Sequence, residues 1–296
     1  MKHKPNFLIV GAAKAGTTSL AYYLSQHPDI YIPETKEPRF FIKDIILALN
    51  NDDPLKDHLL RTSVLDEEKY SDLYNVSQKR RGDASVHYLN DHKEAIPQIK
   101  KHLGDVPIFI MIRNPISRLI SNYNYTKRFN LDVSIDAAIE NEAYKIANNF
   151  NSFWLLKKSG LYYHNIEAYK KHFTNVHIIV FEDFLKQPIK ICQDVFNILN
   201  VNSDFSEINV ENKNPSLEEV KIYKYTKVLF VFLGIKSILS INNIKKIKKR
   251  FFLKKPKTTI SLKSMEMLKS FYELDINKLK ENYKLDCSYW DKDFNS

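Results

Sequence analysis

The stretch FLIVGAAKAGTTSL, residues 7–20, decides the fold. A continuous apolar run ends in Gly11, a short loop closes on Gly16, and Thr17 opens a segment whose apolar residues recur at helical spacing. A short apolar run before a glycine-bounded loop is typical of a strand that is buried on both faces and leads into a helix. Because such a loop directs backbone N–H groups toward one point, it predicts a binding site for a phosphate-like anion.

The rest of the chain repeats this order of strand, loop and helix. Further strands are expected within residues 29–33, 80–89, 107–112 and 176–181, and helices within residues 17–27, 94–104, 115–128, 159–173 and 188–200. This alternation predicts an α/β protein with a P-loop-like three-layer fold, in which helices flank a central parallel β-sheet. Ligands of such sheets bind at the carboxyl ends of the strands.

Length and composition limit the possible domain organisation of the chain. The 296 residues are expected to form a single domain, with residues 203–260 as a loop-rich, basic insertion and residues 261–296 as a closing helix and tail. The two cysteines form no CxxC pair, so neither a disulfide framework nor a zinc site is expected. The apolar runs are too short for a signal peptide or a membrane span, which predicts a cytoplasmic protein.

The net charge of +10 is concentrated in one segment. Twelve of the 45 Lys and Arg residues lie between Val220 and Lys257, a stretch without Asp or Glu, so the remainder of the chain is near neutral. A nucleic-acid-binding protein would carry a basic face through its fold, and no nucleic-acid partner is therefore expected. The segment predicts a local anionic partner instead.

Two departures from the nucleotide triphosphatase pattern define the chemistry. That pattern places a lysine directly after the second glycine, whereas here Lys14 lies inside the loop and Thr17 and Thr18 follow Gly16. The strand at 107–112 ends in Arg113, where a triphosphatase would carry a magnesium-binding carboxylate. A cation at that strand end predicts a second anion site and no requirement for a metal.

Two anion sites at neighbouring strand ends suit a nucleotide with one phosphate group on each side of its ribose. Here the sequence resembles the family of sulfotransferases that use 3'-phosphoadenosine 5'-phosphosulfate (PAPS). GAAKAGTTSL is similar to the family's 5'-phosphosulfate loop, and RNPISRLISNY is similar to its 3'-phosphate motif. Similarity to the glycan-modifying and bacterial branch extends over KEPRFF, GDASVHYL, SGLYYHNIEAYKKHF and VFEDFLKQP, with a weaker match in the ending LKENYKLDCSYW.

The resemblance implies the residues that bind the donor. PAPS would be the co-substrate and 3'-phosphoadenosine 5'-phosphate (PAP) the product. Arg118 either pairs with a phosphate or with an acid on its own helix. The implied donor-binding residues are Ala13, Lys14, Ala15, Gly16, Thr17, Thr18, Ser19, Arg113 and Ser121.

Sulfuryl transfer requires in-line positioning, stabilisation of charge at the bridging oxygen, and removal of the acceptor proton. Lys14 is expected to stabilise the charge. Glu37 is the expected base, because the family's glycan-modifying members use a glutamate there and the flanking Lys36 and Arg39 favour its ionised form.

His87 competes with Glu37 for the role of base. Ser85 and His87 are expected to alternate on one face of a strand, and the phenol and steroid branch of the family uses a histidine in this neighbourhood. The family often carries an aspartate three residues beyond the position of Arg39, where this chain has Ile42.

The expected function is transfer of a sulfuryl group from PAPS to a hydroxyl or amine, with a glycan or lipid-linked saccharide as acceptor. The alternatives are a small-molecule kinase of the P-loop type, a sulfotransferase for small alcohols or phenols, and a nucleotide-sensing protein without turnover.

Residues 228–257 combine an apolar run with eight cations between residues 245 and 257. A peripheral membrane contact on the cytoplasmic face is one interpretation, because cations attract anionic lipid. A buried helix followed by a solvated basic turn is another. The third is a loop that closes over the donor, as the corresponding region does in similar sulfotransferases.

Overall fold

The computed structural model of the chain describes residues 1–35, 37–129, 133–210, 218–219, 253–254, 258–287 and 290. The chain divides into two units, one of residues 1–214 and 260–296 and one of residues 215–259. In the second unit, β6 (Glu218–Glu219) pairs with β7 (Leu253–Lys254) in antiparallel orientation. Most of the basic segment 228–257 lies outside the described residues, and the expected single domain stays a prediction.

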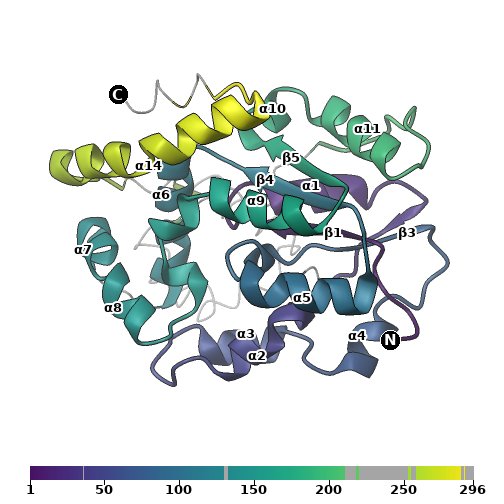
Figure 1. The fold of residues 1–296 in the computed structure, drawn as a ribbon, viewed down its shortest axis with the longest axis horizontal. Coiled ribbons are helices and arrows are strands. Elements are labelled where there is room, and N and C mark those ends of the chain that lie inside the picture. Colours follow the sequence, from purple (N-terminus) through teal and green to yellow (C-terminus); the bar gives the residue numbers. More distant parts are fainter. Residues whose placement is uncertain are drawn as a thin grey trace, which may run out of the picture. The chain divides into compact units, whose positions relative to one another are not determined.

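The first unit is built on a five-stranded parallel sheet, which confirms the predicted fold class (Figure 1). Its strand order is β2-β3-β1-β4-β5. Every residue of β1 and β4 is buried, as expected for the two central apolar runs. The strands are β1 (Phe7–Gly11), β2 (Ile30–Tyr31), β3 (Arg80–Asp83), β4 (Ile108–Ile112) and β5 (Val176–Val180).

Helices cover both faces of this sheet and give three layers. α1 (Thr17–Leu24) packs with α11 (Pro188–Ile198) on one face, and α5 (His92–Leu103) packs with α9 (Tyr163–His172) on the other (Figure 1). Among the described residues, the remaining helices are α2 (Lys43–Leu47), α3 (Lys56–Thr62), α4 (Glu67–Asp72), α6 (Pro115–Thr126), α7 (Ile135–Glu140), α8 (Glu142–Ala147), α10 (Phe181–Lys186) and α14 (Leu262–Tyr283). The short 3₁₀ turns there are η1 (Phe40–Ile42), η2 (Val86–Tyr88), η3 (Lys127–Phe129), η4 (Ser152–Trp154) and η5 (Lys158–Gly160).

The chain leaves the two central strands in opposite directions. From β1 it passes through α1 to β2 on one side of the sheet, and from β4 it passes through α6 and α9 to β5 on the other. The loops that follow these neighbouring strands therefore diverge, and open α/β sheets bind their ligands at such a divergence. The glycine loop (residues 11–16) follows β1, and Arg113 follows β4.

The strand predicted within 80–89 is confirmed as β3, but the placement of Ser85 and His87 on a strand face is wrong. β3 ends at Asp83, and Val86–Tyr88 form the 3₁₀ turn η2. The buried carboxylate of Asp83 accepts hydrogen bonds from both Ser85 Oγ (2.6 Å) and Tyr88 OH (2.9 Å), and this pulls the chain into a turn. The short helices between residues 43 and 72 and between 135 and 147 were not predicted.

We expect Gly16→Ala to destabilise the fold more than Gly104→Ala. Both glycines have positive φ (90° and 75°), a conformation that costs an alanine on the order of 1–3 kcal/mol. A Cβ at Gly16 would lie 2.5 Å from Cδ2 of Phe181, whereas a Cβ at Gly104 meets no atom within 4 Å. Urea unfolding of both variants measures the difference, and equal losses of stability would contradict the close packing of Phe181 on the loop.

Candidate functional site

The glycine loop presents unused N–H groups at the start of α1. Lys14 adopts a left-handed conformation (φ 68°), and Gly16 (φ 90°) is the N-cap of α1. Within the described part of the chain, the N–H groups of Gly16, Thr17 and Thr18 make no hydrogen bond. Such converging donors at a helix N-terminus favour an anion.

The other predicted loop residues fall into two groups. Ala13, Ala15 and Thr17 are buried. Thr18 and Ser19 are partly exposed on the first turn of α1, so their hydroxyl groups can reach an anion at the loop. The loop and the first turn of α1 therefore combine buried residues with partly exposed hydroxyl groups.

Arg113 lies beside this loop, as the sequence predicted from its strand end. Its Nη1 donates to the carbonyl oxygen of Lys14 (3.3 Å), and its guanidinium carbon lies 4.7 Å from the ring centroid of Phe181. The hydroxyl of Tyr162 donates to the Arg113 carbonyl (2.8 Å) and holds its backbone. The structure thus brings the two expected anion sites together.

Two further residues of the RNPISRLISNY stretch lie on α6. Ser121 is 9% exposed, and its hydroxyl makes no hydrogen bond to any described residue. Arg118 is fully buried, and its Nη2 donates to the carbonyl oxygen of Leu156. Ser121 is therefore open to a ligand, whereas Arg118 ties α6 to the chain around Leu156.

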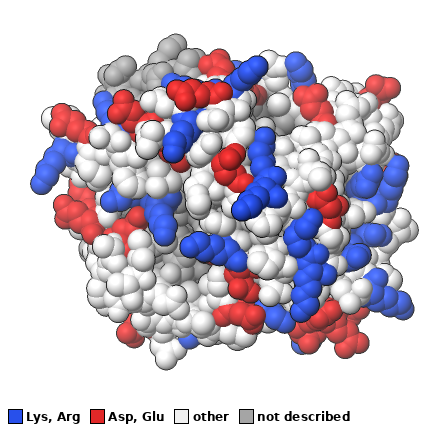
Figure 2. All heavy atoms as spheres, in the orientation of Figure 1, with Lys and Arg blue, Asp and Glu red and all other residues white. Residues whose placement is uncertain are grey.

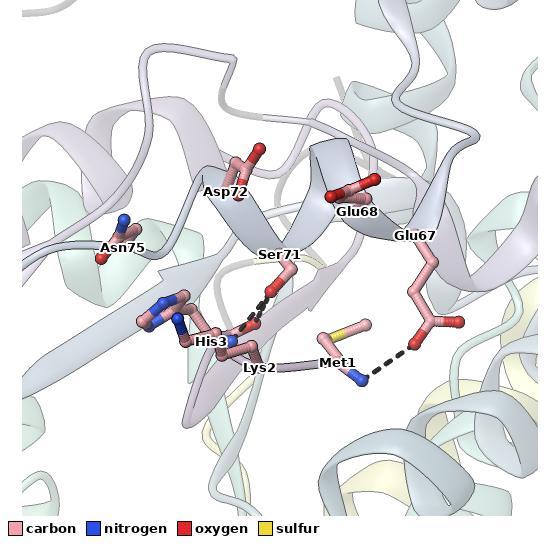
Figure 3. A pocket seen from close by; sticks show the side chains of 8 residues that line it. All are labelled: Met1, Lys2, His3, Glu67, Glu68, Ser71, Asp72 and Asn75. Carbon is pink, nitrogen blue, oxygen red and sulfur yellow. Dashed lines mark hydrogen bonds and ion pairs between the residues drawn. The ribbon is translucent and has the colours of Figure 1, made fainter.

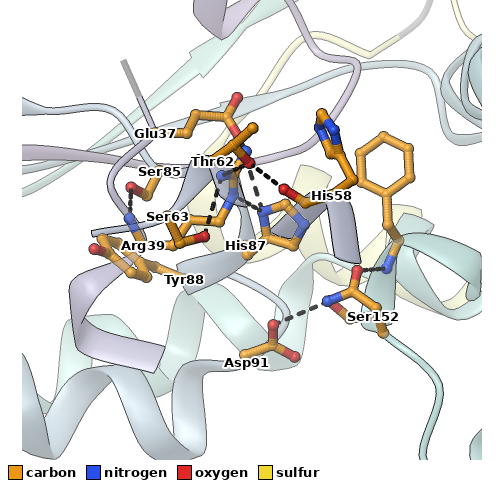
Figure 4. A network of polar contacts seen from close by, with 12 residues as sticks. Glu37, Arg39, His58, Thr62, Ser63, Ser85, His87, Tyr88, Asp91 and Ser152 are labelled. Atoms are coloured by element: carbon orange, nitrogen blue, oxygen red, sulfur yellow. Dashed lines mark hydrogen bonds and ion pairs between the residues drawn. The ribbon is translucent and has the colours of Figure 1, made fainter. Parts of the chain in front are cut away.

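Glu37, Arg39 and His87 form one polar cluster near the ends of β2 and β3 (Figure 4). Arg39 Nη2 pairs with Glu37 Oε2 (2.7 Å), Arg39 Nε donates to His87 Nδ1 (3.3 Å), and His87 Nδ1 lies 3.8 Å from Glu37 Oε2. Because Arg39 can only donate, His87 Nδ1 is the acceptor, and in the neutral ring the proton resides on Nε2. The guanidinium favours the ionised form of Glu37.

Arg39 is held from several sides. Its backbone is left-handed (φ 54°), and its N–H donates to Ser85 Oγ (3.0 Å). Its Nη1 donates to Thr62 Oγ1 (3.3 Å) and Ser63 Oγ (3.4 Å) at the end of α3. Thr62 and Ser63 were not predicted as part of the site, because residues 42–66 carry no recognisable motif. The guanidinium is consequently fixed in place between Glu37 and His87.

Asp83 anchors this cluster from inside the protein. Its carboxylate accepts hydrogen bonds from Ser85 Oγ, from Tyr88 OH, and from Tyr70 OH (2.8 Å). Burial raises the pKa of Asp83 to about 6, although the hydrogen bonds from Ser85, Tyr70 and Tyr88 oppose this rise. The hydrogen bonds run from the Arg39 backbone through Ser85 to a buried carboxylate.

Aromatic rings connect the glycine loop to this cluster. Lys14 Nζ lies 4.5 Å from the ring centroid of Tyr125, whose ring lies 5.2 Å from that of Phe153. The Phe153 ring lies 5.8 Å from the imidazole of His87. Lys14 and His87 therefore border one aromatic surface formed by Tyr125 and Phe153, two residues that were not predicted as part of the site.

A second polar site holds the turn that carries Phe153. Ser152 Oγ donates to Asp91 Oδ2 (3.0 Å), and burial raises the pKa of Asp91 to about 7 (Figure 4). Asp91 N–H in turn donates to the His87 carbonyl (3.0 Å). Asp91 thus ties the turn of Phe153 to the turn of His87.

A cavity of about 490 Å³ lies elsewhere, beside the residues that precede β1 (Figure 3). Its lining includes Glu67, Glu68 and Asp72 of α4, and Met1 N pairs with Glu67 (3.0 Å). Lys2 and the Met1 amino group line it as well, so its charges are mixed, and the cavity is at the amino end of β1 rather than at the glycine loop. It is therefore no candidate for the predicted nucleotide.

Charges on the face shown in Figure 2 are mixed, with Lys and Arg interspersed among Asp and Glu. Among the residues that the structure describes, no helix is long and apolar enough to cross a membrane. Within the same residues, no group of three or more His, Cys, Asp or Glu side chains could hold a metal ion.

We expect the contribution of Asp83 to stability to fall as the pH rises. Its folded pKa of about 6 lies above the ordinary 3.8, so the fold favours the neutral acid. The contribution is complete below about pH 4 and is lost by about pH 6–7, an amount on the order of 3 kcal/mol. Urea unfolding of the wild type and of Asp83→Asn at several pH values isolates this difference.

Asp136→Asn provides a control in which stability should depend on pH in the opposite direction. Hydrogen bonds from Ser264 and Ser261 lower the pKa of Asp136, so its contribution to stability increases as the pH rises. The difference in the free energy of unfolding between the wild type and Asp83→Asn should decrease with pH. A difference that is constant or increases with pH would contradict the raised pKa of the buried Asp83.

Known proteins are similar to this chain in sequence and in fold. A model of the Sulfotransferase family matches residues 5–205. Membrane-associated sulfotransferase kil1 of Dictyostelium discoideum is 24% identical over 74% of this chain and 62% of its own length. Heparan sulfate glucosamine 3-O-sulfotransferase 3B1 of Mus musculus is 26% identical over 58% of this chain and 39% of its own length.

A crystal structure of a sulfotransferase from Alicyclobacillus acidocaldarius superposes with a TM-score of 0.75 at 27% identity, covering 97% of this chain and 98% of that one. The chain thus spans less than two thirds of the two curated relatives but nearly all of this bacterial structure. The family match covers both predicted anion sites and the cluster of Glu37 and His87. The chain belongs to the sulfotransferase family, as its motifs predicted.

Proposed function

We propose that the protein transfers a sulfuryl group from PAPS to a hydroxyl or amine of a saccharide. The observation that carries this proposal is the contact of Arg113 with the Lys14 carbonyl, which joins two anion sites at the divergence of β1 and β4. A nucleotide with phosphates on both sides of its ribose requires two such sites.

The described residues fit this donor. The N–H groups of Gly16, Thr17 and Thr18, together with the hydroxyl groups of Thr18 and Ser19, would hold the 5'-phosphosulfate. The guanidinium of Arg113 and the free hydroxyl of Ser121 would hold the 3'-phosphate. PAPS supplies an activated sulfuryl group whose leaving group is a phosphate.

Lys14, Glu37 and His87 would perform the chemistry. Lys14 would stabilise the negative charge that develops on the leaving phosphate. Glu37 would accept the proton of the acceptor hydroxyl or amine, since the Arg39 guanidinium keeps its carboxylate ionised. His87 receives a hydrogen bond at Nδ1 and would orient the acceptor or, as the alternative, serve as the base.

A saccharide acceptor is supported by two observations. Tyr125 and Phe153 are partly exposed between Lys14 and His87, and aromatic rings of this kind bury the apolar face of a sugar while polar groups orient it. A heparan sulfate glucosamine 3-O-sulfotransferase is also among the relatives. The same rings would accept a phenol, which is the second candidate acceptor.

A peripheral membrane contact through residues 228–257, on the cytoplasmic face, remains part of the proposal. It is supported by the charge of the segment and by the name of the membrane-associated relative. A lipid-linked saccharide would be presented at such a surface.

The test is transfer of labelled sulfate from PAPS, with a chelator present, to fractionated cell-envelope glycans, amino sugars and simple phenols. We expect labelled saccharide as the product. Labelled phenols alone would contradict the acceptor class. Absence of sulfate transfer together with phosphate transfer from ATP in the presence of Mg²⁺ would identify a kinase and contradict the proposal.

Lys14→Ala and Arg113→Ala are expected to separate catalysis from donor binding. Lys14→Ala should lower kcat by about 10²–10³ and leave PAP affinity nearly unchanged, because the loop N–H groups remain. Arg113→Ala should chiefly raise the KM for PAPS, because the 3'-phosphate is remote from the transferred group. Steady-state kinetics and PAP titration measure both, and equal effects of the two substitutions on kcat would refute these roles.

Glu37→Gln is expected to stop transfer without weakening PAP binding. The amide keeps the size of the side chain and an oxygen that can accept from Arg39, but it is not basic; the expected loss in kcat is about 10²–10⁴. His87→Ala is the comparison, with a smaller loss expected. Retained activity of Glu37→Gln, together with an inactive His87→Ala, would assign the base to His87.

A further inference from the structure

Trp290 closes a ring of hydrogen bonds behind the expected 3'-phosphate site. Its indole Nε1 donates to Glu182 Oε2 (3.1 Å), and its carbonyl accepts from Asn114 Nδ2 (3.3 Å). The ring is completed by the Asn114 N–H, which donates to Glu182 Oε1 (3.0 Å). Trp290 and Asn114 are both fully buried, and Glu182 is half-buried.

This ring adjoins both halves of the donor site. Asn114 follows Arg113 directly and caps α6 by accepting from the N–H groups of Ile116 (3.0 Å) and Ser117 (2.9 Å). Glu182 follows Phe181, whose ring faces the Arg113 guanidinium and packs against Gly16. The position of Glu182 therefore determines where Phe181, Arg113 and the glycine loop meet.

We infer that Trp290 is a positioning residue for donor binding, although it lies far along the chain from both phosphate-binding motifs. By holding Glu182 and Asn114 together, it fixes Arg113 in the orientation that receives the 3'-phosphate. This inference rests on the proposed use of PAPS. Because the 3'-phosphate is remote from the reacting atoms, Trp290 acts on donor affinity and not on the chemical step.

The test compares the two tryptophans of the chain. Trp290→Phe removes the indole N–H and keeps a ring in the core. Trp154→Phe is the matched control, because the buried Trp154 also donates its indole N–H to a carboxylate, Asp53 Oδ1 (2.6 Å). Trp290→Phe should weaken PAP binding about tenfold, the equivalent of one hydrogen bond to a charged group. Trp154→Phe should lower the melting temperature alone.

Each single-tryptophan variant also carries its own fluorescent reporter. In Trp154→Phe, PAP should change the emission of Trp290, whereas in Trp290→Phe it should leave the emission of Trp154 unchanged. Glu182→Gln tests the same ring without altering the core tryptophan, because its single amide oxygen cannot serve both donors. When Glu182→Gln and Trp290→Phe are combined, the loss of PAP affinity should be smaller than the sum of the losses, as free energies, of the two single variants.

The outcomes distinguish this inference from the proposed function. A wild-type protein that does not bind PAP overturns both. PAP binding by the wild type together with unchanged affinity of Trp290→Phe, or equal weakening by Trp290→Phe and Trp154→Phe, overturns only the role of Trp290. Unchanged KM for PAPS with reduced kcat in Trp290→Phe would also refute it.

Discussion

The pairing of β1 with β4 is the constraint on which the site depends. Both strands are fully buried and run side by side, yet the chain leaves them toward opposite sides of the sheet. The loops that follow the two strands therefore diverge at one edge of the apolar sheet. One loop carries backbone N–H donors and Lys14, and the other carries Arg113. The proximity of the glycine loop and Arg113 is a consequence of topology, and the hydrogen bond from Arg113 to the Lys14 carbonyl secures their spacing.

The donor side of the site could be predicted from the sequence because its residues follow directly from strand ends. Gly11 and Arg113 each border a continuous apolar run, and a short run of this kind that ends in a loop is typical of a buried strand. Trp290 could not be predicted in this way. Its relation to Asn114 spans 176 residues of chain and exists only through tertiary packing.

The acceptor side was predicted only in part. Glu37 and His87, the two predicted candidate bases, do lie together. The expected alternation of Ser85 and His87 was wrong, because a buried carboxylate at Asp83 draws the chain into a turn that the local sequence pattern does not reveal. Thr62, Tyr125 and Phe153 lie in segments without a motif, and each joins the site through a contact distant in sequence. Such residues become recognisable only after the strands are placed.

A crystal structure of the protein with PAP tests the central claim most directly. The account predicts the 5'-phosphate at the N–H groups of Gly16, Thr17 and Thr18, and the 3'-phosphate at Arg113 and Ser121. The adenosine would then span the crevice between the loops that follow β1 and β4. Density for PAP at any other place, or a 3'-phosphate without contact to Arg113, would contradict the two-site account.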